Sequence, residues 1–272
     1  MTNEFTVNSW EECLAKISDL QKRKNDKGVY PRLLFRGQQD SKWQLETTLE
    51  RAGKTSMDFI EYYRIISYLQ PEIETLTQNQ WQIPEYEDAI KLAKDYDSFS
   101  LAMTFGRTPA YGYMAHLRHH GFPSPLLDWT RSPHIAAYFA FNRHVGSDTV
   151  AIYVLFEATM QSGSSRSPRI VNLGSYVKTH RRHFLQQSEY TMCLIYGDEW
   201  QFMSHEGAFD DWGEGGHPCN FTIYKINVPT SERLKVLRDL DAINLNAFSL
   251  FGSEESLMET LALRELRFTS EN

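Results

Sequence analysis

The sequence predicts an α+β fold built on a mixed or antiparallel sheet. Short apolar segments with the composition of buried strands stand at residues 33–36, 126–127, 150–156, 191–196 and 221–228. Longer segments with apolar residues at helical spacing lie between and around them. The two kinds of segment do not alternate regularly, as the strands and helices of a doubly wound parallel sheet must. A mixed or antiparallel sheet with flanking helices is therefore the expected architecture.

The expected helices carry recognisable start and break signals. Asn8 or Ser9 can cap the first helix, whose apolar residues recur as far as Leu20. Pro71 falls inside a later helical pattern, where it is expected to kink or split the helix. Pro133 stands in the first turn of another helix, where proline is tolerated. The helices after the first are predicted at residues 56–78, 85–105, 110–119, 133–141, 231–240 and 254–263.

One domain is expected, because the 272 residues show neither an internal repeat nor a linker long enough to divide them. Clusters of Gly, Pro and Ser predict loops or turns at residues 121–125, 161–169 and 213–216. Cys13, Cys193 and Cys219 are too scattered for a disulfide framework, and none forms a C-x-x-C pair. A reducing cytoplasm is the expected setting, since neither a signal-peptide pattern nor an apolar run of membrane-spanning length is present.

Charge and motif content narrow the classes of function. The formal net charge of −7 argues against a global electrostatic grip on nucleic acid, which depends on a basic surface. Two basic segments, residues 107–120 and 178–183, could still line a local cleft for an anion; the alternative is that both are solvated faces. No G-x-G-x-x-G, G-x-x-x-x-G-K-[ST] or H-E-x-x-H pattern occurs, so Rossmann, P-loop and zincin sites are not predicted. No metal site is expected either.

Arg36 is the first candidate for a functional site. It follows three apolar residues of a predicted strand, and a buried guanidinium is costly unless an anion meets it. Two interpretations remain open: an ion pair with a carboxylate of the protein, or a clamp for a phosphate. Gly37 would permit close approach of a ligand, and Gln38 adds a polar group.

The second candidate lies between a short strand and a helix. Asp128 or Thr130 can cap the helix that begins at Pro133, with Thr130 the better candidate. A helix N-terminus is also a favourable place for an anion. His119 could act as a base or as a hydrogen-bond donor to a ribose; a structural histidine is the alternative.

Two longer patterns resemble the FRG-domain family, named for its Phe-Arg-Gly. FRGQ at residues 35–38 is followed by a Trp and a Thr-Leu-x-Arg, and residues 119–141 read H-x-G-x-P-x-x-LLDWT-x-SP-x-x-A-x-YFAF. Arg182 and Gln186 extend the resemblance, whereas Ser124 stands where the family usually has Thr, and a long helical segment separates the two blocks. The resemblance implies one FRG-type domain over residues 1–272, with a core at 28–200, a helical insertion at about 55–106 and a C-terminal helical cap at about 230–268.

A third pattern resembles the arginine-class ADP-ribosyltransferases. These enzymes carry an Arg on a first strand, then a Ser/Thr strand leading into a helix of small residues, then a Gln/Glu-x-Glu just before a later strand. The corresponding residues here are Arg36, Thr130 with Ser132, and Gln187 with Glu189. The likeness implies a split sheet of the ADP-ribosyltransferase type and makes Arg36, Thr130, Gln187 and Glu189 the candidate catalytic residues. Glu189 as a surface residue that starts a strand is the alternative.

NAD would then be the substrate. Arg36 would hold its pyrophosphate, Glu189 would stabilise an oxocarbenium-like transition state, and Gln187 would position the acceptor. We therefore expect Glu189 and Arg36 to lie on the same side of one pocket. The residues expected to bind NAD, including aromatic rings that could stack on nicotinamide, are Arg36, Gly37, Gln38, His119, Asp128, Trp129, Ser132, Tyr138 or Phe139, and Gln186.

The expected function is NAD-dependent ADP-ribosylation of a macromolecule. The acceptor would be RNA, DNA or protein, and the role that of a bacterial toxin or anti-phage effector held in check by an antitoxin or inhibitor protein. Two alternatives from other classes remain: a non-catalytic module that binds a nucleotide or a partner, and a metal-independent nuclease. No membrane association is expected.

Overall fold

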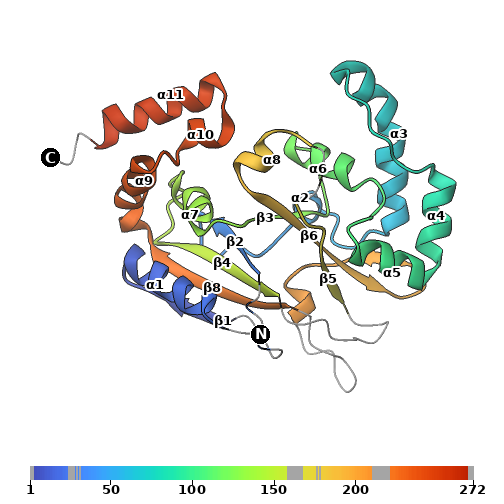
Figure 1. Cartoon of the computed structure of the whole chain (residues 1–272), viewed down its shortest axis with the longest axis horizontal. Coiled ribbons are helices and arrows are strands. Elements are labelled where there is room, and N and C mark those ends of the chain that lie inside the picture. Colours follow the sequence, from blue (N-terminus) through green and yellow to red (C-terminus); the bar gives the residue numbers. More distant parts are fainter. Residues whose placement is uncertain are drawn as a thin grey trace.

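The computed structural model describes residues 3–23, 28, 30, 32–157, 168–175, 177, 179–209 and 221–268. Within them, strands form one eight-stranded sheet in the order β1-β8-β4-β2-β3-β6-β5, with β7 paired to β6 (Figure 1). Only β1 and β8 pair in parallel among the described ladders, and every other pair is antiparallel. The prediction of an α+β fold with a mixed sheet is confirmed. The strands are β1 (Asn3–Thr6), β2 (Leu33–Gln38), β3 (Leu127–Thr130), β4 (Thr149–Glu157), β5 (Arg169–Asn172), β6 (Ser188–Tyr196), β7 (Trp200–Phe202) and β8 (Phe221–Pro229).

The sheet is nearly divided in two between β2 and β3. On one side, β2 pairs with β4 along its whole length, from Leu33↔Phe156 to Gln38↔Ala151. On the other, β2 meets β3 through a single pair, Phe35↔Thr130. Beyond that pair the two strands diverge, so the sheet opens at the residues that follow Phe35.

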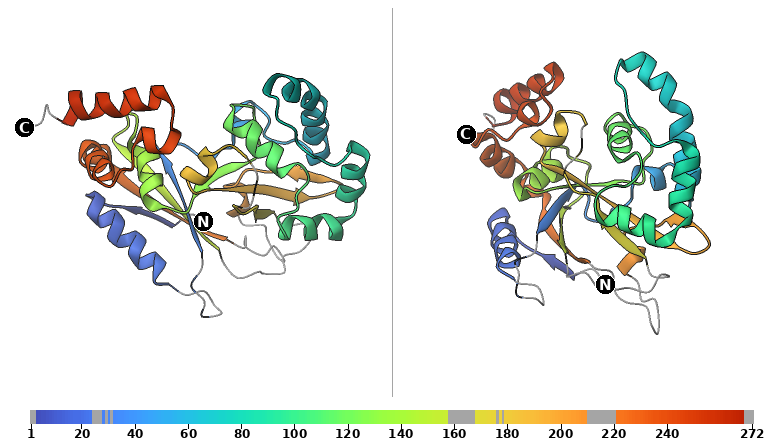
Figure 2. Two further views of the ribbon diagram at one scale, coloured as in Figure 1. Left: turned by 45° about the horizontal axis from the view of Figure 1, so that its top comes forward. Right: turned by 45° about the vertical axis from the view of Figure 1, so that its right-hand side comes forward.

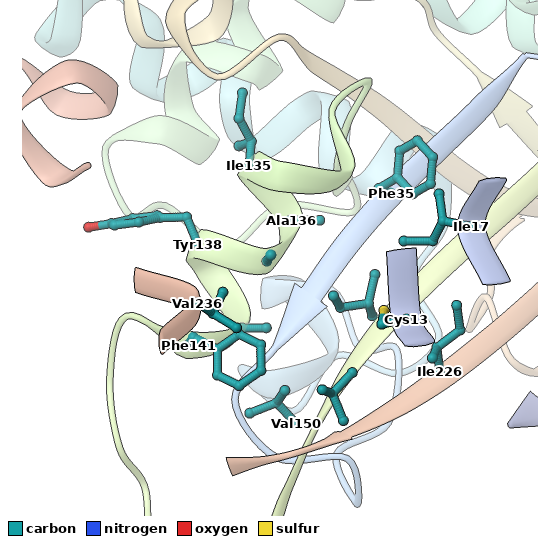
Figure 3. Packing of buried hydrophobic residues seen from close by; sticks show 14 of the residues in the cluster. Cys13, Ile17, Phe35, Ile135, Ala136, Tyr138, Phe141, Val150, Ile226 and Val236 are labelled. Carbon is teal, nitrogen blue, oxygen red and sulfur yellow. The ribbon is translucent and has the colours of Figure 1, made fainter. Parts of the chain in front are cut away.

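The helices gather in two groups at opposite ends of the sheet (Figures 1 and 2). The first group packs on β2, β4 and β8, where Phe35, Phe141 and Ile226 belong to one buried cluster (Figure 3). The second group packs against β5, β6 and β7 around Phe59 and Trp200. The first group comprises α1 (Trp10–Gln21), α7 (Pro133–Phe141), α9 (Arg233–Ala242), α10 (Ala247–Phe251) and α11 (Glu254–Leu263); the second comprises α3 (Phe59–Thr77), α4 (Tyr86–Lys94), α5 (Tyr96–Thr104) and α6 (Tyr111–His119).

Most predicted helices are present, with three differences. Ser9 is the N-cap of α1, and its hydroxyl accepts a hydrogen bond from the backbone of Glu12. Pro71 lies inside α3, which continues to Thr77 instead of splitting. The helix predicted at 85–105 is two helices, because Asp95 adopts an extended backbone and caps α5 through its side chain. The short helices α2 (Thr48–Arg51), α8 (Arg182–Leu185) and α10 were not predicted.

A few predictions fall on residues that the structure does not describe. The turn at 213–216, the loop at 161–167 and Cys219 lie outside the described residues, while Arg169, at the end of that loop, is already part of β5. Cys13 and Cys193 are both buried. Among the described helices, none combines the length and the apolar content that a bilayer crossing requires.

Candidate functional site

A pocket of about 390 Å³ opens where β2 and β3 diverge. Residues 35–39 form one wall and residues 128–130 form the facing wall. The ends of α6 and α2, the side of α7, the turn from α8 into β6, and the last residue of α10 complete it. Seven separate segments of the described chain therefore meet where the sheet opens.

Arginines dominate the charge of this pocket. Arg36, Arg51, Arg118 and Arg182 line it, and Asp128 is the single acidic residue among the described lining residues. The four guanidinium groups come from β2, α2, α6 and α8, so no single basic segment accounts for them. A chain with net charge −7 thus concentrates positive charge at the split of its sheet. Such a pocket favours an anionic ligand.

Asp128 is held by Arg118 in a bidentate ion pair. Nε of Arg118 donates to Oδ1 at 2.9 Å, and Nη2 donates to Oδ2 at 2.5 Å. Burial alone would raise the pKa of Asp128, but Arg118 and Arg36 together hold that pKa below its usual value. The carboxylate is therefore charged at neutral pH, and its side chain remains 41% exposed.

Arg36 is buried and only partly satisfied. Its Nη1 donates to the backbone oxygen of Asp128 at 2.9 Å and lies 3.9 Å from the Asp128 carboxylate. Its Nε is buried without a hydrogen-bond partner. Burial lowers the pKa of Arg36 to about 10, which still leaves the group positive at pH 7. The structure thus contains part of the ion pair that the sequence allows, but Asp128 is shared with Arg118, and the guanidinium keeps a donor for a further anion.

His119 lines the pocket as a neutral imidazole. Burial lowers the pKa of His119 to about 4. Its Nε2 is 2.6 Å from the hydroxyl of Tyr190, which also lines the pocket. His183 stacks on the ring of Tyr190 and is fixed by a 2.9 Å contact between its Nε2 and the carbonyl of Ser175. His119 is therefore positioned as a hydrogen-bonding group and adds no charge at neutral pH.

Thr130 lies at the pocket but does not cap α7, whereas Ser132 caps α7 and does not line the pocket. Thr130 lines the pocket, but its hydroxyl donates to the backbone oxygen of Gln186 at 2.7 Å and accepts from the backbone of Ser132. The N-cap of α7 is Ser132, whose hydroxyl accepts from Ile135, so the expectation that Thr130 or Asp128 caps this helix is wrong. Ser132 itself is not among the lining residues. Thr130 fixes the joint between β3 and α8.

Neighbouring glutamines have different environments. Gln186 is buried, lines the pocket and donates from Nε2 to the carbonyl of Leu250 in α10 at 3.3 Å. Gln187 is exposed in the left-handed region, with φ 47°, and is not among the lining residues. The geometry therefore places Gln186, and not Gln187, at the pocket.

Glu189 lies on the other face of its strand. Successive side chains of a strand point in opposite directions, and Ser188 and Tyr190 are the β6 residues that line the pocket. Glu189 is fully buried and pairs with Arg32 and, at 3.8 Å, with Arg131. The expectation that Glu189 shares one pocket with Arg36 is wrong, and so is the alternative of a surface residue.

The remaining predicted residues divide between the pocket and its supports. Gly37 lines the pocket, but the space of its missing side chain is filled by the backbone of α7, not by a ligand. Gln38 and Trp129 also line it. Nε2 of Gln38 donates to the carbonyl of Gln44 at 3.0 Å, while its Oε1 is buried without a partner. Nε1 of Trp129 donates to the hydroxyl of Thr191 at 2.7 Å. Tyr138 is not among the lining residues and faces a different cavity, whereas its neighbour Phe139 lines the pocket.

Sequence reasoning missed several lining residues. Arg51 and Trp43 stand in the Thr-Leu-x-Arg and Trp positions of the first pattern, and Arg118 stands in a basic segment noted for its charge. Each had a signal in the sequence, but nothing indicated that they converge. Phe251 had no such signal, because it comes from a distant short helix.

One comparison with known proteins matches the part of the chain that supplies most residues of this pocket. Residues 31–149 match the model of the FRG domain. Neither the curated proteins nor the solved structures gave a match to the chain. The matched residues include Arg36, Arg51, Arg118 and Asp128, while Arg182 comes from beyond them. The resemblance to the FRG domain is thus confirmed for residues 31–149.

Proposed function

We propose that the pocket binds a dinucleotide of the NAD type and that the protein transfers ADP-ribose from NAD to a macromolecule. The observation that carries the proposal is the ratio of charges: four arginines face one carboxylate in a pocket of an acidic chain. Planar guanidinium groups bind phosphate oxygens two at a time. A diphosphate is therefore the anion that best fits several arginines around one space.

The size and the walls of the pocket suit the rest of a nucleotide. Its volume of about 390 Å³ falls in the range of roughly 300–1,000 Å³ that small-molecule sites occupy. Trp43, Phe139 and Phe251 contribute aromatic rings, and Arg182 lies over the ring of Phe251 at 5.4 Å. Aromatic rings of this kind stack on planar bases. We assign the arginines to the diphosphate and the rings to adenine or nicotinamide.

The proposed reaction breaks the bond between nicotinamide and C1′ of its ribose. Nicotinamide leaves with the bonding electrons, and a nucleophile of the acceptor forms the new bond to C1′. The proton of the acceptor passes to His119, a neutral imidazole, and then to solvent. A carboxylate near the developing positive charge would stabilise the transition state. Asp128 is the acidic residue that faces the pocket, so we assign it the role expected for Glu189.

The pairing of Asp128 with Arg118 favours a second candidate. A carboxylate held by two hydrogen bonds from a guanidinium has less negative charge to offer a substrate. A non-catalytic module that binds a nucleotide would keep the same pocket and the same arginines. The two candidates make the same prediction for binding and opposite predictions for turnover.

Calorimetric titration and turnover assays separate these candidates. We expect the protein to bind NAD and ADP-ribose, and Asp128→Asn to bind NAD within a few-fold of the parent while losing NAD consumption. If the parent protein binds NAD but never consumes it with any cell extract, the transferase is excluded and the non-catalytic binding module is supported. Absence of binding to NAD, ADP-ribose and ADP would overturn both.

The cellular role that we propose is a toxin or anti-phage effector restrained by an inhibitor protein. Expression of the parent should arrest growth and leave an ADP-ribose adduct on nucleic acid or protein, detected by mass spectrometry. Arg36→Ala should abolish both effects. Strand scission without an adduct would instead indicate a nuclease.

A further inference from the structure

A second cavity, of about 260 Å³, lies beside α7 and shares no lining residue with the first. It is lined by residues of α7, α9, α10, α11 and the π-helical turn Arg264–Phe268 and is open on one side to solvent. Two successive residues of α7 line different cavities: Phe139 lines the first and Tyr138 lines the second. Figure 3 shows the ring of Tyr138 extending away from the side chains of Phe35 and Ala136.

The walls of this cavity are mainly aliphatic. Leu237 comes from α9, Leu245 from the segment before α10, Ala247 from α10 and Leu263 from α11. Leu266, in the π-helical turn, is the exposed leucine of the lining. A cavity of this composition favours the apolar body of a small molecule.

Two buried donors in this cavity have no partner in the protein. Tyr138 is only 3% exposed, and its hydroxyl makes no hydrogen bond. Asn142 and Glu259 lie near that hydroxyl, but neither bonds it with normal geometry. Nε of Arg233 is also buried without a partner, while its Nη2 donates to the carbonyl of Asn142 at 3.0 Å. Buried donors without a partner are rare in folded proteins, and a bound ligand can supply the missing acceptor.

The charges of the lining residues indicate the sign of that ligand. Arg233 and Arg267 are basic and Glu259 is the single acidic residue among the described lining residues. Burial lowers the pKa of Arg233, because removal from water disfavours the charged guanidinium. A bound anion would offset this cost of desolvation. A hydroxyl and a guanidinium nitrogen are both able to donate to a carboxylate.

We propose that this cavity is a second binding site, for a small aliphatic carboxylate. Its carboxylate would accept hydrogen bonds from Tyr138 and Arg233, and its chain would lie against the leucines of α9 and α11. At about 30 Å³ for each water-sized group, the volume accommodates roughly eight heavy atoms, the size of hexanoate. The proposal is independent of the nucleotide site, because the two cavities have no residue in common.

The test compares three probes of equal chain length: hexanoate, hexan-1-ol and hexylamine. Binding would be measured by methyl-detected NMR titration of the full chain, which also locates the probe at the leucines of α9 and α11. We expect hexanoate to bind about tenfold more tightly than hexan-1-ol and hexylamine to bind most weakly. Equal affinities, a preference for hexylamine, or no binding of any probe would overturn the proposal.

Tyr138→Phe is the decisive variant, because it removes an oxygen that bonds nothing in the protein and leaves the ring in place. It should weaken hexanoate about tenfold, leave hexan-1-ol unchanged, and melt at or above the parent temperature. Tyr68→Phe is the matched control, since Tyr68 is exposed on α3 and far from this lining. Unchanged hexanoate affinity in Tyr138→Phe would reject the assigned contact and with it the carboxylate site.

Discussion

Arg36 holds a positive charge in a largely buried position, with its side chain 13% exposed and its Nε unbonded. Arg36→Ala should weaken NAD binding about ten- to hundredfold, because one charge-assisted contact contributes roughly 1.5–3 kcal/mol. The fold should persist, since Asp128 keeps its bidentate contact with Arg118. Calorimetric titration measures the affinity and thermal melting monitors the fold.

The matched control for this change is Arg64→Ala. Arg64 is exposed on α3 and does not line the pocket. The Arg64→Ala protein should bind NAD with the affinity of the parent. A folded Arg36→Ala protein with parent affinity would remove Arg36 from the proposed clamp.

Gly37 has a packing role that its place in the FRG string does not reveal. A Cβ at this position would lie 1.9 Å from the carbonyl oxygen of Ala136 and 2.6 Å from the backbone nitrogen of Ala140. Both atoms belong to the backbone of α7, so they move only if the helix moves. Gly37→Ala should therefore lower the free energy of unfolding by about 1–3 kcal/mol, the usual cost of overpacking. Urea denaturation provides the measurement, and parent-like stability would show that α7 is not fixed at this contact.

Side chains along β6 alternate between the face that lines the pocket and the face that packs behind it. Ser188 and Tyr190 face the pocket, whereas Glu189 faces Arg32 and Arg131 on the opposite side. Glu189→Gln should therefore lower stability by about 1–3 kcal/mol, because it removes the charge of a buried carboxylate that pairs with two half-exposed arginines. NAD affinity should remain within a few-fold of the parent. A variant with parent melting temperature and no turnover would restore Glu189 to the catalytic role.

The same alternation explains which features could be predicted from the sequence. Long periodic segments such as β4 and α7 were recognisable, because their apolar residues recur along many positions. The direction of Glu189 was not, because a one-residue change of phase in a strand reverses its face. Nor was the break at Asp95, where a capping side chain ends one helical pattern and begins another. Arg36 and Asp128 were correctly placed at one site, but the contact by which Arg118 holds Asp128 could not be predicted from the basic segment that contains Arg118.

Buried histidines make the stability of the whole molecule sensitive to acid. Burial lowers the pKa of His116 and His119 to about 4 and that of His205 to about 3, from an ordinary value of 6.5. Between these values the unfolded chain binds protons that the folded chain does not. The contribution of these groups is therefore complete above pH 6.5 and is lost as the pH falls toward 4 and below.

We therefore expect the urea midpoint to decrease steadily as the pH is lowered from 7 to 4. The measurement is a series of urea denaturation curves at constant ionic strength. A midpoint that stays level or rises over this interval would contradict the neutral state of these histidines in the folded protein.

The single pair Phe35↔Thr130 has a mechanical consequence. Strands β1, β8, β4 and β2 form one half of the sheet, here called the first plate, and strands β3, β6, β5 and β7 form the other half, the second plate. A single residue pair joins the two plates. Arg36 belongs to the first plate, while Asp128 and Tyr190 belong to the second. A ligand that contacts residues of both plates would act as a non-covalent cross-link between them. The stiffness of the molecule would therefore depend on whether the pocket between β2 and β3 is occupied.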